Sequence, residues 1–263
     1  MFKAEIEEVG LLKDSMKTIS DLISEGLFQL EEDGLRLVAA DPALVGLVHF
    51  KIEKDLFEEF DLEEETMVGL NIENLYSILR RANADDTITL ELDDSRFHIT
   101  MENSSTRNFS LPRLNLSEDD IPETDQLEFD FEAELEASVI EGAVKDAMVV
   151  SDAVTISASD SELNIKAEGD QSNAEFTITE GSEGVLSMEG DQVKSMFSLD
   201  YLSKMIGGKK LSENVTIKLG DDFPMRMEFV RPDEMDLSFV LAPRIEEDKN
   251  DFRRVRRPVR FFC

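Results

Sequence analysis

Few residue combinations in this sequence could perform catalysis. The 263-residue chain contains two histidines and one cysteine, and it lacks the GxxxxGK(S/T), GxGxxG, HExxH and CxxC patterns of nucleotide and metal sites. His49 and His98 both fall within alternating apolar patterns typical of strands, which favours structural roles for them. We therefore expect a protein that is not an enzyme and that requires no cofactor.

Runs of carboxylates are the other groups that could do chemistry. Glu63-Glu64-Glu65 and Asp221-Asp222 could bind a divalent cation. They lack the spacing of a calcium-binding loop and are more typical of solvated surface, so we expect no metal site. The alternative from another class of protein is a metal-dependent hydrolase, which would need several of these acids to converge in one cleft.

Basic residues are concentrated in four segments with helical spacing and one apolar face each, namely Gly10–Ile23, Asn71–Ala82, Ala137–Val150 and Leu199–Lys210. Gly207-Gly208 is expected to end the last helix. The four segments hold eight bases and six acids in a chain of net charge −32. Either their outer face must avoid repelling something negative, or lysines simply favour helix ends. The bases are Lys13, Lys17, Arg80, Arg81, Lys145, Lys204, Lys209 and Lys210.

The rest of the sequence has the alternation of antiparallel strands. Phe28 and Leu30 alternate into a turn, and Leu35 and Leu37 continue after it, which predicts a hairpin with one buried face. The same pattern recurs through the second half of the chain. Because the helices are short and amphipathic, they must pack on the sheets, and the fold class is α+β.

The chain repeats itself. FKAEIEE from Phe2 matches FEAELEA from Phe131, and LNIENLYSIL from Leu70 matches FSLDYLSKMI from Phe197. Three further matches follow in the same order, at offsets between 127 and 131 residues. Collinear matches at a nearly constant offset indicate a duplicated domain.

The domain boundaries follow from this repeat. We expect a first domain over residues 1–114, a linker over 115–128, a second domain over 129–248 and a flexible basic tail over 249–263. The linker is acidic, contains Pro122 and has no strand pattern. The tail carries six bases and one acid, whereas residues 1–248 have a net charge of −37.

The composition excludes several classes of protein. With 59 acidic and 27 basic residues, the chain is not a nucleic-acid binder that works by bulk positive charge. No apolar run is long enough to span a membrane, and 41% hydrophobic residues argue against disorder. The opening MFKAEIEEVG is no signal peptide, so a cytoplasmic location is expected. The acidity suits a salt-loving cell or, alternatively, a basic partner.

Several strings in the chain resemble the DNA sliding clamps of archaea and eukaryotes, the PCNA family. They are MFKAEI, LRLVAADPALVGLV, FSLDYL, KAEGD and FVLAPRIEED, and they occur in order over about Met1 to Asp248. The acidity resembles that of a clamp from a halophilic archaeon. Lys249–Cys263 lies outside the resemblance.

This resemblance implies a fold and a way of acting. Its members have two duplicated DNA-clamp domains, each with two helices packed under curved antiparallel sheet. Three subunits close head-to-tail into a ring, and double-stranded DNA passes through it without sequence preference. The four helices would line the hole, so the eight bases named above would face phosphate. Whether the ring is homomeric is left open by the sequence, as is an acidic adaptor with no DNA function.

The resemblance also implies two protein-binding surfaces. Subunits would meet through strand edges, for which Asn108, Phe109 and Leu111 match in the first domain and Phe176 and Ile178 in the second. The alternative is that both strands are satisfied in their own sheets. A hydrophobic pocket would receive peptides of DNA polymerase, clamp loader, flap endonuclease and DNA ligase. The matching pocket positions are Leu44, Val45, Leu47, Ile121, Pro122, Phe223, Pro224, Ala242, Pro243 and Ile245.

Two positions depart from the family's pocket. Asp119 and Asp120 stand in the linker where an apolar residue often occurs, which puts the linker's share of the pocket in doubt.

Overall fold

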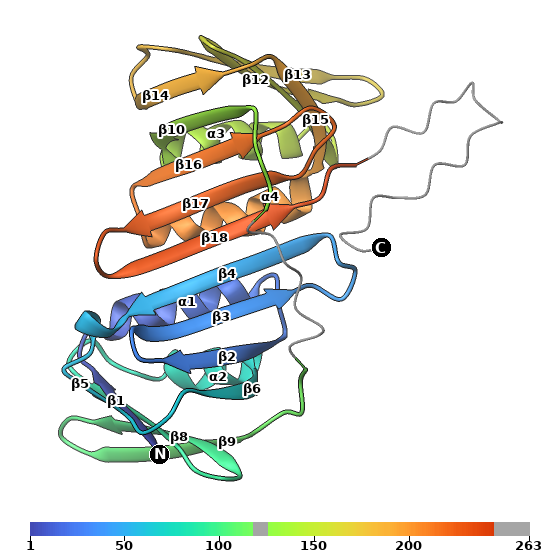
Figure 1. Cartoon of the computed structure of the whole chain (residues 1–263). Helices are drawn as coiled ribbons and strands as arrows, with labels where there is room; N and C mark the ends of the chain where they lie inside the picture. Colours follow the sequence, from blue (N-terminus) through green and yellow to red (C-terminus); the bar gives the residue numbers. More distant parts are fainter. Residues whose placement is uncertain (118–125, 245–263) are drawn as a thin grey trace. The chain divides into compact units, whose positions relative to one another are not determined.

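The computed structural model describes residues 1–117 and 126–244 of the chain, which is drawn in Figure 1. The described residues form two compact units: one of residues 1–42, 47–117 and 230–238, the other of 43–46, 126–229 and 239–244. Most of the predicted linker and the whole of the predicted tail lie outside the described residues, so the domain boundaries stay predictions.

The elements of the first half of the chain follow one another in this order: β1 (Phe2–Ile6), α1 (Val9–Ser20), β2 (Glu25–Glu31), β3 (Gly34–Ala40), β4 (Gly46–Glu53), the 3-10 helix η1 (Lys54–Leu56), β5 (Glu59–Leu62), β6 (Thr66–Asn71), α2 (Ile72–Leu79), β7 (Thr87–Leu92), β8 (Arg96–Glu102) and β9 (Thr106–Pro112).

The second half repeats the same order of helices and strands: β10 (Phe131–Glu136), α3 (Ala137–Met148), β11 (Ala153–Ser159), β12 (Glu162–Glu168), β13 (Asn173–Thr179), β14 (Val185–Gly190), β15 (Val193–Ser198), α4 (Leu199–Met205), the 3-10 helix η3 (Ile206–Lys210), β16 (Asn214–Leu219), β17 (Met225–Arg231) and β18 (Met235–Leu241).

The sheet topology repeats as well. In the first half, five strands lie in the order β5-β1-β7-β8-β9 and four in the order β4-β3-β2-β6. In the second half, five lie in the order β14-β10-β16-β17-β18 and four in the order β13-β12-β11-β15. Because every strand has its equivalent at the same place, the predicted duplication and the α+β fold class are confirmed.

The hairpins have the registers that the alternation predicts. Glu31 pairs with Gly34 across the first turn, and Leu92 pairs with Phe97 across the turn between β7 and β8. Gly34 has φ of 147°, and a side chain there would collide with the carbonyl oxygen of Ile52. Glycine is therefore required for the close approach of β4 to this turn.

The helices lie against the sheets of their own unit, as Figure 1 shows, and bury their apolar faces there. In α1 the buried side chains include Leu12, Met16 and Ile19, which have the i, i+4, i+7 spacing of one face. The Asn71 side chain accepts a hydrogen bond from the Asn74 N–H at 2.8 Å, which caps the start of α2. No helix within the described residues is long and apolar enough to cross a membrane.

The last helix differs from the prediction. Helical spacing predicts one helix over Leu199–Lys210, but α4 ends at Met205 and the chain continues as the 3-10 helix η3. Gly208 is buried against the ring of Phe229, where an added Cβ would lie 2.4 Å from a ring carbon. Close packing on this ring therefore accompanies the tighter turn, and the sequence of the helix alone does not contain that contact.

Candidate functional site

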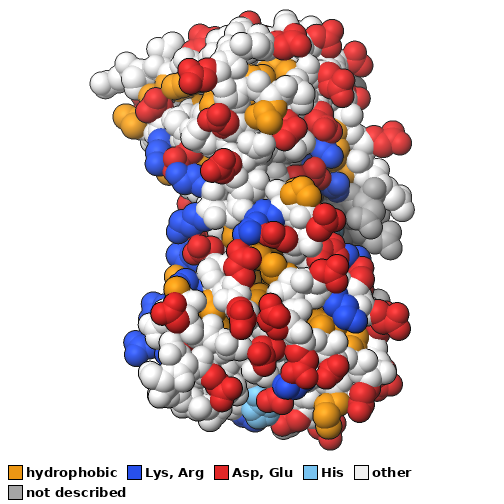
Figure 2. Space-filling model, turned by 90° about the vertical axis from the view of Figure 1, so that its left-hand side faces the viewer, with side chains coloured by type: hydrophobic (Ala, Val, Ile, Leu, Met, Phe, Trp, Pro, Cys, Tyr) orange, Lys and Arg blue, Asp and Glu red, His pale blue; other side chains and the backbone are white. Residues whose placement is uncertain are grey.

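All eight predicted bases lie on helices or directly beside them, and none of them is buried. Lys13 and Lys17 are one turn apart on α1, opposite its buried face. The view in Figure 2 shows basic side chains gathered along the left-hand margin and acidic ones spread over much of the rest. The other positions are Arg80 and Arg81 just after α2, Lys145 in α3, Lys204 in α4, and Lys209 and Lys210 in η3.

Half of these bases are paired with carboxylates of the same helical surface. Lys17 contacts Asp21 at 2.5 Å and Lys204 contacts Asp200 at 2.8 Å, both at i, i+4 spacing. Glu141 contacts Lys145 at 2.8 Å and Lys209 at 2.6 Å. Within the described residues, no carboxylate lies within ion-pair distance of the remaining four, which are Lys13, Arg80, Arg81 and Lys210.

The turn after α2, which carries Arg80 and Arg81, is fixed by a backbone hydrogen bond and by a buried ion pair. The carbonyl of Arg81 accepts a hydrogen bond from the Arg107 guanidinium at 2.8 Å, and that guanidinium also pairs with Asp86. Asp86 accepts a further bond from the Asn83 N–H at 2.6 Å. The Asn83 bond first, and then Arg107, hold the pKa of the Asp86 carboxyl below its usual value. The two arginine side chains project from this fixed turn into solvent.

The two strands predicted at the subunit interface are both at the ends of sheets. β9 is last in its five-stranded order and β13 is first in its four-stranded order, so each lacks a neighbour on one side within the described chain. Phe109 and Phe176 are half-exposed on these strands, and Asn108 is exposed. Leu111 and Ile178, however, are only 7% and 5% exposed, so they belong to the cores of their own units.

An exposed apolar pair near β13 was not predicted. Met148 and Val149 follow the buried stripe of α3, and 47% and 85% of their surfaces are exposed. The same helix packs against β13. Their signal in the sequence is two large apolar residues placed off the helical stripe that ends at Ala147.

Several predicted pocket residues meet in the second unit. Leu44 has φ of 56°, and it and Val45 are half-buried in the loop between β3 and β4. The Val45 carbonyl accepts a hydrogen bond from the Ala242 N–H at 2.9 Å, which ties this loop to the chain after β18. Pro243 is half-exposed beside Ala242. Leu47 is fully buried and forms no part of the surface, which corrects its predicted role as a pocket wall.

The loop before β17 supplies the aromatic part of this region. The Ser195 hydroxyl donates to the Gly220 carbonyl at 2.9 Å and accepts from the Phe223 N–H at 3.1 Å, which fixes the loop around Phe223. Pro224 is buried and Phe223 is half-exposed. Ile121, Pro122 and Ile245 lie outside the described residues, so their predicted share in the pocket stays a prediction.

Phe129 is a further candidate that the sequence patterns missed. Its ring packs edge-on against Phe223 at 5.9 Å between centroids, and the guanidinium of Arg226 lies 5.5 Å from its ring centre. It is half-exposed. Its only signal is one aromatic residue at the end of a predicted linker.

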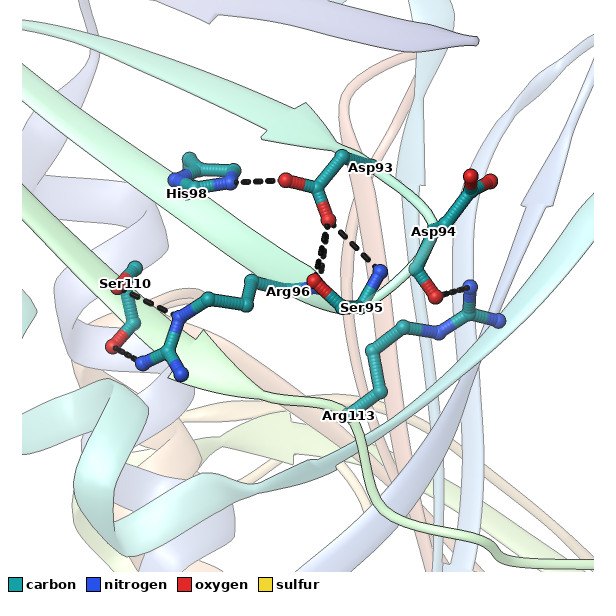
Figure 3. Close-up of polar contacts among 7 residues, drawn as sticks. All are labelled: Asp93, Asp94, Ser95, Arg96, His98, Ser110 and Arg113. Atoms are coloured by element: carbon teal, nitrogen blue, oxygen red, sulfur yellow. Dashed lines mark hydrogen bonds and ion pairs between the residues drawn. The ribbon is translucent and has the colours of Figure 1, made fainter.

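The turn between β7 and β8 carries a compact polar network, drawn in Figure 3. Asp93 accepts hydrogen bonds from the N–H groups of Ser95 and Arg96, both at 2.7 Å, and contacts His98 Nε2 at 2.7 Å. The Arg96 guanidinium donates to the hydroxyl and the carbonyl of Ser110 on β9. The network therefore braces the edge strand β9, and the structural role predicted for His98 fits this placement.

The described residues contain no group of three or more His, Cys, Asp or Glu side chains placed to hold a metal ion. Neither Glu63-Glu64-Glu65 nor Asp221-Asp222 forms part of such a group among these residues.

Profiles of one protein family match both halves of the chain. The N-terminal domain of Proliferating cell nuclear antigen matches residues 1–122, and its C-terminal domain matches residues 120–244. A relative called DNA polymerase sliding clamp, from Pyrococcus furiosus, is 36% identical over 88% of this chain and 93% of its own length. DNA polymerase sliding clamp 1 from Thermococcus kodakarensis is 35% identical over 89% and 94%.

Solved structures show the same fold. PCNA from Thermococcus kodakaraensis superposes with a TM-score of 0.85 at 25% identity, over 93% of this chain and all of that one. A chain of the PCNA2-PCNA3 complex from Sulfolobus tokodaii gives a TM-score of 0.83 at 24% identity, over 92% and 99%. The duplicated unit with paired helices under antiparallel sheet thus defines a DNA-clamp fold. Since both halves match its profiles, the chain belongs to the Proliferating cell nuclear antigen (PCNA) family.

Proposed function

We propose that this chain is a DNA polymerase sliding clamp that encircles double-stranded DNA as a ring of three subunits and tethers replication and repair enzymes to it. The observation that carries the proposal is the pair of helical faces, one in each repeat, where bases gather in a strongly acidic chain. The clamp itself performs no chemistry, and this stays a prediction.

Encirclement explains how so acidic a protein can act on DNA. Contacts with phosphate weaken steeply with salt, by about 0.9 in log–log slope for each neutralised phosphate. A closed ring remains on DNA by topology and needs little affinity, so its inner bases need only offset repulsion. The acidic outer surface would then prevent adhesion elsewhere on the duplex.

Ring closure is proposed through the two free sheet edges. β9 ends a five-stranded sheet and β13 ends a four-stranded sheet, so the edges are unlike. Pairing unlike edges of successive copies is heterologous and closes into a ring when the rotation suits. Phe109, Phe176 and the exposed pair Met148 and Val149 supply apolar surface for this contact.

Partner binding is proposed at the apolar surface of the second unit. Leu44, Val45, Phe129, Phe223 and Pro243 are half-buried there and offer an apolar seat for aromatic side chains of a peptide. DNA polymerase, clamp loader, flap endonuclease and DNA ligase are the proposed partners. Tethering raises their effective concentration at the template without new contacts with DNA.

Two predictions about the setting of this protein accompany the proposal. The chain has a net charge of −32, which favours a cell with high internal salt. A surface this acidic stays hydrated and soluble at salt concentrations at which less charged proteins associate. A halophilic source and a cytoplasmic location both stay predictions.

The test is topological. The protein is loaded with a clamp loader onto nicked circular DNA, the complex is isolated at high salt, and the DNA is then linearised. A sliding clamp stays on the circle and leaves after linearisation. Equal retention on circle and linear DNA would indicate ordinary affinity, and no retention on either would favour the adaptor without DNA function.

A further inference from the structure

Of the three paired carboxylates on the helical faces of the described chain, Glu141 is the least exposed and the one that contacts two lysines. It lies on α3, accepts from Lys145 one turn later at 2.8 Å, and contacts Lys209 of η3 at 2.6 Å. Its side chain is only 19% exposed. The hydrogen bonds from Lys145 and then from Lys209 lower the pKa of the Glu141 carboxyl, which favours its ionised form.

The other two paired acids differ from Glu141 in both respects. Asp21 and Asp200 are 44% and 68% exposed, and each serves a single lysine. Exposed i, i+4 pairs are weak and are readily exchanged for another partner. Glu141 is more enclosed than these two acids, so salt screens its contacts less.

The pairing makes the two helical faces electrically unlike. Three of the four bases without a carboxylate partner in the described chain, Lys13, Arg80 and Arg81, belong to the first unit. Three of the four paired bases, namely Lys145, Lys204 and Lys209, belong to the second. A lysine beside a carboxylate presents a dipole to a distant phosphate, and its field decays faster than that of a free charge.

We propose that Glu141 suppresses phosphate contacts by Lys145 and Lys209 of the second unit, so that DNA in the ring is contacted chiefly through the bases without a carboxylate partner in the described chain, Lys13, Arg80, Arg81 and Lys210. This inference rests on the proposed function, because it assumes that the helical faces meet DNA. It assigns to one acid the role of limiting electrostatic drag on a sliding ring.

The test compares charge-neutralising variants of the full chain. Binding of a short DNA duplex is measured by fluorescence anisotropy over a salt series for the wild type, Glu141→Gln, Asp200→Asn and Asp146→Asn. Asp146 is the matched control, since it is an exposed acid on the same helix with no ion pair in the described part of the chain. All three variants gain the same net charge, so differences between them report released lysines.

Glu141→Gln should steepen the slope of log K against log salt by up to about 1.8, for two lysines at about 0.9 each. Asp200→Asn should add up to about 0.9, and Asp146→Asn should change the slope little. Adding Lys145→Gln and Lys209→Gln to Glu141→Gln should abolish the gain. In the wild-type background, Arg80→Gln with Arg81→Gln should reduce the slope more than that lysine pair does.

A slope for Glu141→Gln that is no steeper than the slope for Asp146→Asn would overturn the inference. If the melting temperature of Glu141→Gln also falls, the role of Glu141 is only to join α3 to η3. That failure is distinct from failure of the proposed function. In the former the wild type stays on circular DNA and leaves after linearisation, whereas in the latter the wild type is retained equally on both forms of DNA or on neither.

Discussion

Arg107 on the edge strand β9 forms an ion pair with Asp86, whose side chain is completely buried. The same guanidinium donates to the Arg81 carbonyl at 2.8 Å, so one residue joins the sheet edge to the basic turn after α2. Within the described chain, Asp86 Oδ1 and Arg107 Nε have no hydrogen-bond partner. The ion pair is therefore enclosed but lacks some of its possible hydrogen bonds. Removing one partner should destabilise the fold, because the other partner is then left as an unpaired buried charge.

Arg107→Ala should lower the melting temperature by roughly 5 to 10 °C, because it leaves a buried carboxylate unpaired. Adding Asp86→Ala should restore part of this loss, since no buried charge then remains. Arg36→Ala is the control: Arg36 is 44% exposed and lies 3.6 Å from Glu31, so its loss should cost about 2 °C or less. Wild-type melting of Arg107→Ala would contradict the role given to the pair.

Asp93→Asn should lower the melting temperature of the protein more at neutral pH than in acid. The hydrogen bond with His98, followed by those from the N–H groups of Ser95 and Arg96, holds the pKa of the Asp93 carboxyl far below its ordinary value. A carboxyl with a lowered folded-state pKa contributes stability that is complete above about pH 4 and is lost as the pH falls through the folded pKa. Melting temperatures of the wild type and the variant should therefore converge between about pH 4 and pH 2.

Asp94→Asn is the matched control for this titration. Asp94 is the next residue in the same turn, but its contact with Arg113 uses the backbone carbonyl, and its carboxylate points away in Figure 3. Asp94→Asn should leave the melting temperature at neutral pH close to that of the wild type, because the contact with Arg113 through the backbone is kept. If the melting temperatures of the Asp93 and Asp94 variants fall in parallel as the pH is lowered, the hydrogen-bond network of this turn does not contribute to stability.

Phe109→Glu should break the ring at its proposed interface. A charge on the exposed edge of β9 would have to be buried against β13 of the next subunit, which costs far more than the aromatic contact contributes. Native mass measurement in high salt should give about 90 kDa for three wild-type chains of 29.7 kDa and the single-chain mass for the variant.

Val230→Glu controls for added charge on an exposed apolar position away from these edges, because Val230 is 45% exposed on β17. It should leave the trimer intact. A wild type that is monomeric alone would speak against a ring of identical chains and require a ring with different subunits.

Phe129→Ala should reduce binding of a client peptide with two aromatic residues by about tenfold, or about 1.4 kcal/mol. The variant removes one ring of the edge-on pair with Phe223 and leaves the latter unsupported. Leu186→Ala removes an apolar side chain that is 50% exposed on β14 and should leave the affinity unchanged. Titration calorimetry with the peptide measures both, and equal affinities would remove Phe129 from the site.

Much of the fold could be predicted because its information is local. Alternation predicts the pairing of Leu92 with Phe97, and helical spacing predicts the buried stripe of Leu12, Met16 and Ile19. The repeat adds a check, because each element must appear twice. Gly207-Gly208 predicts an end of the last helix, and α4 stops just before this pair. The 3-10 helix η3 that follows could not be predicted, since it involves Gly208 packing on Phe229 of β17.

The candidate site was predicted less completely, for two physical reasons. Alternation tells which side of a strand faces the core but not how deeply a residue lies, so Leu47 and Leu111 were placed at surfaces although both are buried. Ion pairs between distant segments leave no spacing signal, and the contact of Lys209 with Glu141 is one of these. Counting bases along the helices therefore overestimates the free positive charge.

The two repeats share every α-helix and strand in the same order, yet their helical faces do not carry the same pattern of ion pairs. The two units therefore have the same fold but could not replace each other without changing the charge of the helical faces. A chimera built from two first units would keep both kinds of sheet edge and gain unpaired bases. Such a chain would be expected to assemble into a ring normally, but to bind DNA more tightly and slide along it more slowly.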